Sequence, residues 1–230
     1  MSNLEQKPFL SKLVHNMIEI IIFDFDGVII NEFEEHYSFY KKRIEGLTKE
    51  EFKSLFEGNL HEKLKSFKER DRGLDPQDNY GLYQRSVDVD FKIKEILKKL
   101  SKKYVLGIIS SGLEEDLKIA LHNNEMGSVF TFIYGKETHS SKVEKFKLVF
   151  ENYKVEPKQC IFVTDTIGDI IEARKVGVES IAVDYGYHER KRIQKVNPLK
   201  IVSSFSEIRR AIESASRRQS LNGLNPQFST

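Results

Sequence analysis

Short runs of consecutive apolar residues recur along the chain, each with the length of a β-strand. They span residues 20–25, 104–109, 131–134, 160–164 and 180–183. Their apolar positions are continuous and do not alternate with polar ones, which is typical of strands buried on both faces. The runs therefore predict a parallel sheet that helices cover on both sides.

Three of the segments between these runs have apolar residues at helical spacing, so each is expected to be a crossover helix between two strands. The resulting fold class is α/β, with a doubly wound, Rossmann-like parallel sheet as the core. The residues that carry the helical spacing are Ile93, Ile96, Leu97 and Leu100, then Leu113, Leu117, Ala120 and Leu121, then Val143, Phe146, Val149 and Phe150.

The connection after the first strand is much longer than the others, at roughly sixty residues, and a loop of that length needs structure of its own. Apolar residues there again recur at helical spacing, from Phe33 to Ile44, from Phe52 to Phe56 and from Leu60 to Phe67. We therefore expect a small α-helical cap domain over residues 32–88. Residues 1–31 and 89–213 are expected to form the core.

The last part of the chain has a different composition. Residues 214–230 are rich in Ser, Asn, Gln and Arg and show hardly any periodicity. Such a composition favours disorder, so this segment is predicted to be a disordered tail.

Charge and cysteine content narrow the class of protein. The 230 residues carry 37 basic and 35 acidic side chains, a net charge of +2, so no nucleic-acid partner is expected. The single cysteine, Cys160, lies in an apolar run and suits a reducing compartment.

The N-terminal stretch has no signal-peptide core, and Asp24 ends the first apolar run far short of a membrane span. We expect a cytoplasmic protein with no membrane association.

Two carboxylates lie at the end of the first apolar run. Asp24 and Asp26 lie two residues apart, so in an extended chain both point to the same side. In open α/β sheets ligands bind beyond the carboxyl ends of the strands, which is where this pair is expected. A polar strand end that runs into the turn at Gly27 is the alternative explanation.

A pair of serines follows the second run. Ser110 and Ser111 precede a helix whose N-terminal N–H groups could bind an anion, and Ser110 could hold a phosphoryl oxygen there. The alternative is structural, because Ser111 and Glu114 have the spacing of a helix capping box.

A lysine, Lys142, falls in the first turn of the third crossover helix, after Ser141 and before Glu144, which again have capping-box spacing. A cation at a helix N-terminus opposes the helix dipole by about 0.3 to 1 kcal/mol. A nearby cluster of carboxylates would compensate for that cost; otherwise Lys142 is an ordinary surface residue.

The fourth run supplies two more carboxylates, which can face the same crevice as the other candidates. Asp165 follows the strand directly, and Asp169 falls in the first turn of the next helix. For Asp169 the alternative is a capping role, since acidic residues are favoured in a first turn.

Taken together in this order, these motifs resemble those of the haloacid dehalogenase superfamily, in the phosphoglycolate phosphatase and β-phosphoglucomutase-like group, over residues 20–208. Asp24 to Val28 looks like the first motif, Ser110 the second, Lys142 the third, and Asp165 with Asp169 the fourth. The departures from the pattern are Asn31, where relatives often have an acid, Thr164 in place of Gly, and no Pro after Lys142.

The resemblance implies a Mg²⁺-dependent phosphatase. Asp24 would be the nucleophile that forms an aspartyl phosphate, and Asp26 the general acid and base. Ser110, Ser111 and Lys142 would bind the phosphoryl group. Mg²⁺ would be held by the acids of the first and fourth motifs, with Asp26 contributing its backbone carbonyl. This metal set consists of Asp24, Asp26, Asp165 and Asp169.

Other functions stay open. A β-phosphoglucomutase-like phosphomutase keeps all four motifs, and a non-catalytic phospho-switch or binding protein can cluster acids and a lysine in the same way. A dehalogenase needs no proton donor, so Asp26 argues against that reaction. The expected partner is a small phosphorylated metabolite, and the chain is expected to be a monomer or a homodimer.

Overall fold

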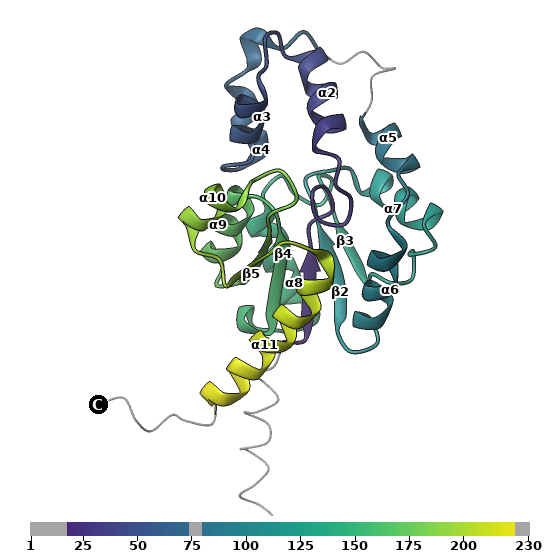
Figure 1. Cartoon of the computed structure of the whole chain (residues 1–230), viewed down its shortest axis with the longest axis vertical. Helices are drawn as coiled ribbons and strands as arrows, with labels where there is room; N and C mark the ends of the chain where they lie inside the picture. Colours follow the sequence, from purple (N-terminus) through teal and green to yellow (C-terminus); the bar gives the residue numbers. More distant parts are fainter. Residues whose placement is uncertain (1–17, 74–79, 224–230) are drawn as a thin grey trace, which may run out of the picture.

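A computed structural model describes residues 18–73 and 80–223. Its core is a sheet of six parallel strands in the order β3-β2-β1-β4-β5-β6 (Figure 1). The predicted α/β fold with a parallel sheet is therefore confirmed. The strands are β1 (Ile20–Phe23), β2 (Val105–Ile109), β3 (Phe132–Tyr134), β4 (Cys160–Thr164), β5 (Glu179–Val183) and β6 (Lys200–Val202).

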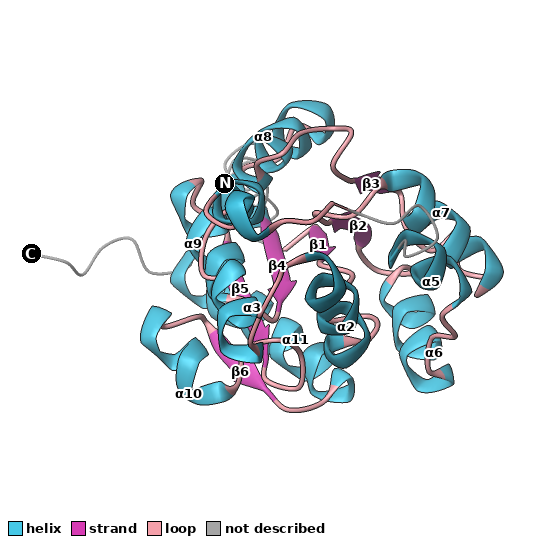
Figure 2. Ribbon diagram, turned by 90° about the horizontal axis from the view of Figure 1, so that it is seen from above, coloured by secondary structure: helices cyan, strands magenta, loops and turns pink. Residues whose placement is uncertain are grey.

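Helices cover both faces of this sheet, as seen from above in Figure 2. In β1, Ile21 and Phe23 face a core built with α6, α7 and α11, whereas Ile20 and Ile22 face α8 and α9. Every residue of β1 is buried, which explains why its apolar run is continuous. The bounds are α6 (Phe91–Leu100), α7 (Glu114–Asn123), α8 (Lys142–Tyr153), α9 (Ile167–Lys175), α10 (Arg190–Ile193) and α11 (Phe205–Gly223).

The C-terminal part differs from the sequence prediction. α11 continues to Gly223, so residues 214–223 are helical in the structure where the sequence predicts a disordered tail, and residues 224–230 lie outside the described part. Ile208, Ala211, Ile212 and Ala215 bury one face of this helix against the sheet. Its apolar spacing thus extends beyond residue 213, where the predicted core ended.

The long insertion after β1 folds into helices, which lie above the carboxyl ends of the strands in Figure 1. Its apolar side chains form a separate small core around Ile44, Leu47, Phe52 and Leu55. The cap boundaries at residues 32 and 88 stay a prediction, and residues 74–79 lie outside the described part. The elements are α2 (Phe33–Arg43), α3 (Lys49–Leu55), α4 (Leu60–Lys65), η1 (Lys68–Arg70) and α5 (Tyr80–Ser86).

The last of these helices, α5, packs against α7 of the core. The guanidinium of Arg85 on α5 donates to Asp116 Oδ1 at 2.6 Å, and the amide of Asn123 donates to the Arg85 carbonyl at 2.9 Å. In the sequence α5 belongs to the insertion, yet its contacts fix it to the core.

No helix among the described residues combines the length and the apolar character that a bilayer-spanning segment requires.

Candidate active site

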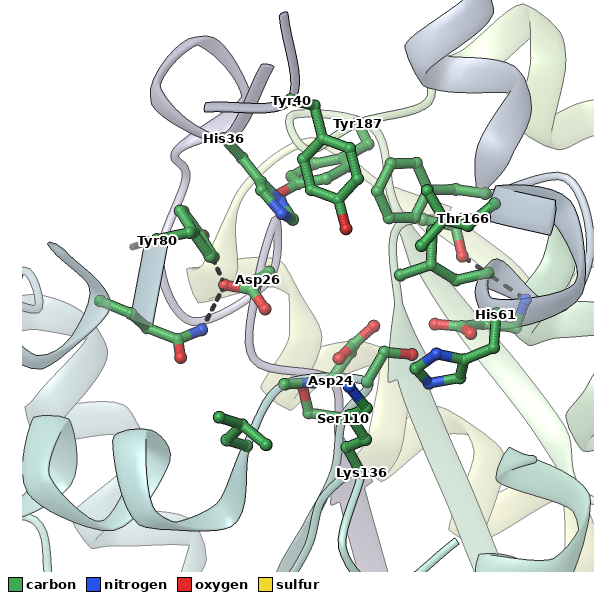
Figure 3. A pocket seen from close by; sticks show the side chains of 18 of the residues that line it. Asp24, Asp26, His36, Tyr40, His61, Tyr80, Ser110, Lys136, Thr166 and Tyr187 are labelled. Carbon is green, nitrogen blue, oxygen red and sulfur yellow. Dashed lines mark hydrogen bonds between the residues drawn. The ribbon is translucent and has the colours of Figure 1, made fainter. Parts of the chain in front are cut away.

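A cavity of about 250 Å³ lies between the carboxyl ends of the central strands and the helices of the insertion. β1 pairs with β2 on one side and β4 on the other, so the chain order switches at β1, where ligands bind in doubly wound sheets. Most of the residues that the sequence singled out line this cavity (Figure 3). They are Asp24, Asp26, Ser110, Ser111, Lys142 and Asp169.

A lysine at the floor of the cavity joins two of the carboxylates. Lys142 Nζ lies 2.7 Å from Asp24 Oδ2 and 2.7 Å from Asp169 Oδ2, and the three side chains are buried. Asp24 Oδ1 accepts the Phe25 N–H at 2.8 Å, and Asp169 Oδ2 also accepts the Thr164 hydroxyl at 2.8 Å. The compensation that a lysine in a first turn needs is therefore present.

These contacts act on the protonation of the three groups. Burial raises the pKa of Asp24, and the Lys142 ammonium opposes that rise. Burial also acts to raise the pKa of Asp169, but Lys142 and Thr164 hold it below its ordinary value. The pKa of Lys142 is raised, because the two carboxylates outweigh the effect of burial. The lysine is therefore charged at neutral pH.

Asp165 lies behind the first-motif loop and does not line the cavity itself. Its Oδ2 accepts the Tyr187 N–H at 2.6 Å, whereas its buried Oδ1 has no hydrogen-bond partner among the described residues. Burial raises the pKa of this carboxyl to about 7. Gly27 has a φ of +75° here, and a Cβ on it would lie 2.0 Å from Asp165 Oδ2. Only a glycine allows this approach.

The unpartnered oxygen of Asp165 fits a metal ligand, because a buried carboxylate oxygen needs a cation or a donor. However, within the described residues no three side chains of His, Cys, Asp and Glu come together as a ligand group. Lys142 lies between Asp24 and Asp169, and one oxygen of Asp26 is already bound by two donors, as shown below. The four carboxylates of the predicted metal set therefore do not all point at one position. The ligands that fit a metal ion here are Asp24, Asp165 and the backbone carbonyl of Asp26.

Ser110 lies at the end of β2 and is almost fully buried. Its Oγ accepts the Gly112 N–H at 3.0 Å, and its carbonyl accepts Lys145 Nζ at 2.5 Å. Burial, reinforced by Lys142, lowers the pKa of Lys145 to about 8. The sequence reasoning did not single out Lys145, although it lies one helical turn from Lys142 and so faces the same side of α8.

The N-termini of three helices show whether the candidate residues there act as helix caps. α7 begins after Leu113 without a side-chain cap, so Ser111 does not cap it. Ser141 precedes α8, but its hydroxyl donates to Glu172 at 3.1 Å and does not cap the helix. At α9 the Thr166 hydroxyl does accept the Asp169 N–H, at 3.4 Å, so Asp169 lies in a capped first turn and also faces Lys142.

Asp26 is held from the insertion. Its Oδ1 accepts the Tyr80 hydroxyl at 2.7 Å and the Gln84 side-chain amide at 2.7 Å (Figure 3). The Tyr80 hydroxyl also lies 2.9 Å from Oε2 of Glu32, which is buried. Burial raises the pKa of Asp26, and these two donors oppose the rise. The sequence reasoning missed Tyr80, Gln84 and Glu32, since none belongs to a recognised motif.

The insertion closes over the cavity. The Gly168 N–H in the first turn of α9 donates to the Phe56 carbonyl at 2.9 Å, and His36 Nδ1 lies 2.5 Å from the Tyr187 hydroxyl. Burial lowers the pKa of His36 to about 3, so its ring is neutral. Apolar and aromatic side chains from the insertion line the upper part of the cavity, among them Phe39, Tyr40, Phe56, Leu60 and Leu64.

Comparison with known proteins agrees with this geometry. The chain is 21% identical over 212 residues to a phosphoglycolate phosphatase of Synechococcus elongatus, an alignment that covers 87% of this chain and all of that protein. It is 28% identical over 120 residues to a phosphoglycolate phosphatase of Pseudomonas savastanoi pv. phaseolicola, covering 50% of this chain and 44% of that one. The chain thus spans under half the length of this Pseudomonas relative.

Solved structures share the fold. A predicted phosphatase from Clostridium acetobutylicum superposes with a TM-score of 0.68 at 20% identity, covering 86% of this chain and 99% of the other. A hydrolase from Pseudomonas syringae gives a TM-score of 0.70 at 16% identity, covering 85% and 98%. Finally, the family model for haloacid dehalogenase-like hydrolases matches residues 21–183, from the first strand of the sheet to the fifth. The chain therefore belongs to the haloacid dehalogenase-like hydrolase family.

Proposed function

We propose that this chain is a magnesium-dependent phosphatase that hydrolyses a small phosphomonoester through an aspartyl phosphate on Asp24. The observation that carries the proposal is the placement of Lys142 Nζ at 2.7 Å from both Asp24 and Asp169, at the floor of the cavity. A cation in that position balances a nucleophilic carboxylate and can attract a phosphoryl dianion.

In the first half of the reaction, Asp24 attacks phosphorus in line and the bond to the leaving oxygen breaks. Asp26 gives its proton to that oxygen. Ser110, Ser111 and Lys142 bind the phosphoryl oxygens. Burial keeps the pKa of Asp26 above its ordinary value, which favours the acid form that this step needs.

In the second half, a water molecule attacks the phosphorus of the aspartyl phosphate and gives a proton to Asp26. Phosphate leaves and Asp24 is regenerated. Contacts such as that between His36 and Tyr187 hold the insertion over the cavity and exclude further water.

Asp24, Asp165 and the Asp26 backbone carbonyl would hold Mg²⁺, with Asp169 as a direct or water-mediated ligand. When bound, the ion would supply positive charge that favours the ionised Asp24 and neutralises the phosphoryl oxygens. The buried Oδ1 of Asp165 supports this assignment, because no residue that the structure describes donates a hydrogen bond to it.

Two relatives are phosphoglycolate phosphatases, which makes 2-phosphoglycolate the first substrate to test. A small phosphorylated metabolite as the partner and a cytoplasmic location complete the proposal.

The test is hydrolysis of p-nitrophenyl phosphate with and without Mg²⁺, comparing the wild type with Asp24→Asn. Asp88→Asn is the matched control, because that side chain is 88% exposed. Turnover that needs both the metal and Asp24, and that survives Asp88→Asn, is the expected result. Turnover by Asp24→Asn would remove Asp24 as the nucleophile. A wild type that neither turns over nor becomes phosphorylated would point to a non-catalytic phospho-binding protein.

A further inference from the structure

Asp26 has two side-chain donors on a single oxygen. Tyr80 and Gln84 lie one turn apart on α5, and both reach Oδ1 at 2.7 Å. Gln84 is 1% exposed, so its amide is withdrawn from water and directed at this carboxyl. Neither residue belongs to the family motifs described above.

These donors are themselves held in place. α5 is fixed to α7 through the pairing of Arg85 with Asp116. The Tyr80 ring stacks on His36 with a centroid separation of 3.8 Å and an interplanar angle of 9°. The position of Oδ1 is therefore set by α5, whose two donors lie 54 and 58 residues from Asp26 in the sequence, and His36 on α2 supports the Tyr80 ring.

The arrangement distinguishes the two oxygens of Asp26. An oxygen that accepts two strong hydrogen bonds does not also carry the carboxyl hydrogen, because that hydrogen would face the two donors. The hydrogen of the acid form therefore belongs on Oδ2.

We propose that Tyr80 and Gln84 are positioning residues, which hold Oδ1 of Asp26 and leave Oδ2 to exchange protons during hydrolysis. In the first half-reaction the Oδ2–H bond breaks and the proton goes to the leaving oxygen, which keeps the electron pair of the broken P–O bond. In the second half the attacking water forms its bond to phosphorus and returns a proton to Oδ2. This inference rests on the proposed phosphatase function.

Two substrates of nearly the same shape test it. Phenyl phosphate releases the more basic leaving group and needs the proton from Asp26, whereas p-nitrophenyl phosphate releases a stable anion and depends on it much less. For both substrates kcat/KM reports the steps up to formation of the aspartyl phosphate.

The variants are Tyr80→Phe, which keeps the ring on His36, and Gln84→Met, which keeps the length of the side chain. We expect kcat/KM for phenyl phosphate to fall by about 10- to 100-fold in each, and that for p-nitrophenyl phosphate by less than about threefold. Tyr83→Phe is the matched control: it lies on the same helix and does not line the cavity, and phenylalanine keeps the ring whose centroid is 6.1 Å from those of Phe39 and Tyr80. It should leave both values unchanged.

If the two residues were purely structural, their variants would lose kcat/KM equally for both substrates and would also unfold at a lower temperature. An unchanged ratio of the two kcat/KM values would therefore overturn the inference. Unchanged activity on both substrates would overturn it as well. In either case an active wild type leaves the phosphatase proposal intact. A wild type without activity on either substrate would instead refute that proposal, and the positioning roles with it.

Discussion

The backbone N–H of Gly168 in α9 donates to the carbonyl of Phe56 in the insertion at 2.9 Å, which brings the core and the insertion into backbone contact beside the cavity. A Cβ on Gly168 would lie 2.5 Å from the Gly58 carbonyl oxygen and 2.8 Å from that of Phe56. Because these are backbone atoms, they cannot give way as a flexible side chain would.

Gly168→Ala should therefore separate the insertion from the core and lower activity. We expect kcat/KM for p-nitrophenyl phosphate to fall by about 10- to 100-fold, as small displacements of catalytic groups do. Gly127→Ala is the control, since a Cβ there meets nothing within 4 Å. Wild-type kinetics in Gly168→Ala would show that this contact does not govern closure.

Gly27→Ala should displace the side chain of Asp165. The new Cβ would lie 2.0 Å from Asp165 Oδ2, at a backbone φ of +75°. Gly73→Ala separates the two effects, because Gly73 has a φ of +83° but open space around it. We expect Gly73→Ala to lose about 1 kcal/mol of unfolding free energy and to keep its activity.

For Gly27→Ala we expect a larger loss of stability, together with a Mg²⁺ dependence of activity that moves to at least about tenfold higher concentration. Urea unfolding and a magnesium titration of turnover measure the two quantities. Equal behaviour of the two alanine variants would show that the contact with Asp165 has no consequence.

Lys142→Met should leave Asp24 and Asp169 facing each other without their shared cation. Removing one partner of a buried ion pair costs about 3 to 5 kcal/mol of unfolding free energy. We also expect kcat/KM to fall by at least about 100-fold, the usual effect of losing a group that stabilises transition-state charge.

Lys147→Met is the matched control on the same helix. Lys147 pairs with Glu144 at 2.8 Å and its side chain is 57% exposed. Surface pairs of this kind contribute at most about 1 kcal/mol, so stability and turnover should hardly change. Similar losses in both variants would mean that Lys142 acts as an ordinary helix residue.

Glu32 should make stability depend on pH. Burial, the Asp26 carboxylate and Glu35 raise its pKa to about 8 from an ordinary 4.5, against the opposing hydrogen bond from Tyr80. Between these two values the unfolded chain has lost a proton that the folded chain keeps. Stability from this group is thus complete below pH 4.5 and falls as pH rises towards 8, by at most about 1.4 kcal/mol per pH unit.

Glu32→Gln cannot titrate and should flatten this dependence. Urea unfolding at pH 5, 6, 7 and 8 should show the wild type losing more stability than the variant over that interval. Glu34→Gln, at a side chain that is 63% exposed, should follow the wild type. A variant curve parallel to the wild-type curve would show that Glu32 is already ionised in the folded chain.

Much of the core could be predicted because its strands are buried on both faces. A run such as Cys160 to Thr164, which is wholly buried, has no polar position to interrupt it. β6 was missed for the opposite reason: among its three residues, Lys200 is exposed and only Val202 is buried. Its apolar content is too small to distinguish it from a loop.

The candidate site divides in the same way. Asp24, Lys142 and Asp169 could be identified because each follows a strand or starts a helix at one edge of the sheet. Tyr80 and Gln84 could not, since their role depends on where the insertion returns to the core, and local spacing carries no information about that. Their hydrogen bonds to Asp26 join residues that are 54 and 58 positions apart, and such contacts can be seen only in the three-dimensional structure.

α5 belongs to the insertion in the sequence, but its attachment to α7 means that it does not have to move with α2, α3 and α4. If α2, α3 and α4 swing away to admit substrate, His36 leaves the Tyr80 ring, but α5 stays docked through Arg85 and Asp116. Asp26 then keeps both donors in the open enzyme as well as in the closed one. Each opening would thus move α2, α3 and α4 away from the cavity while Asp26 keeps its hydrogen bonds to Tyr80 and Gln84. These hydrogen bonds would not have to form again in each turnover.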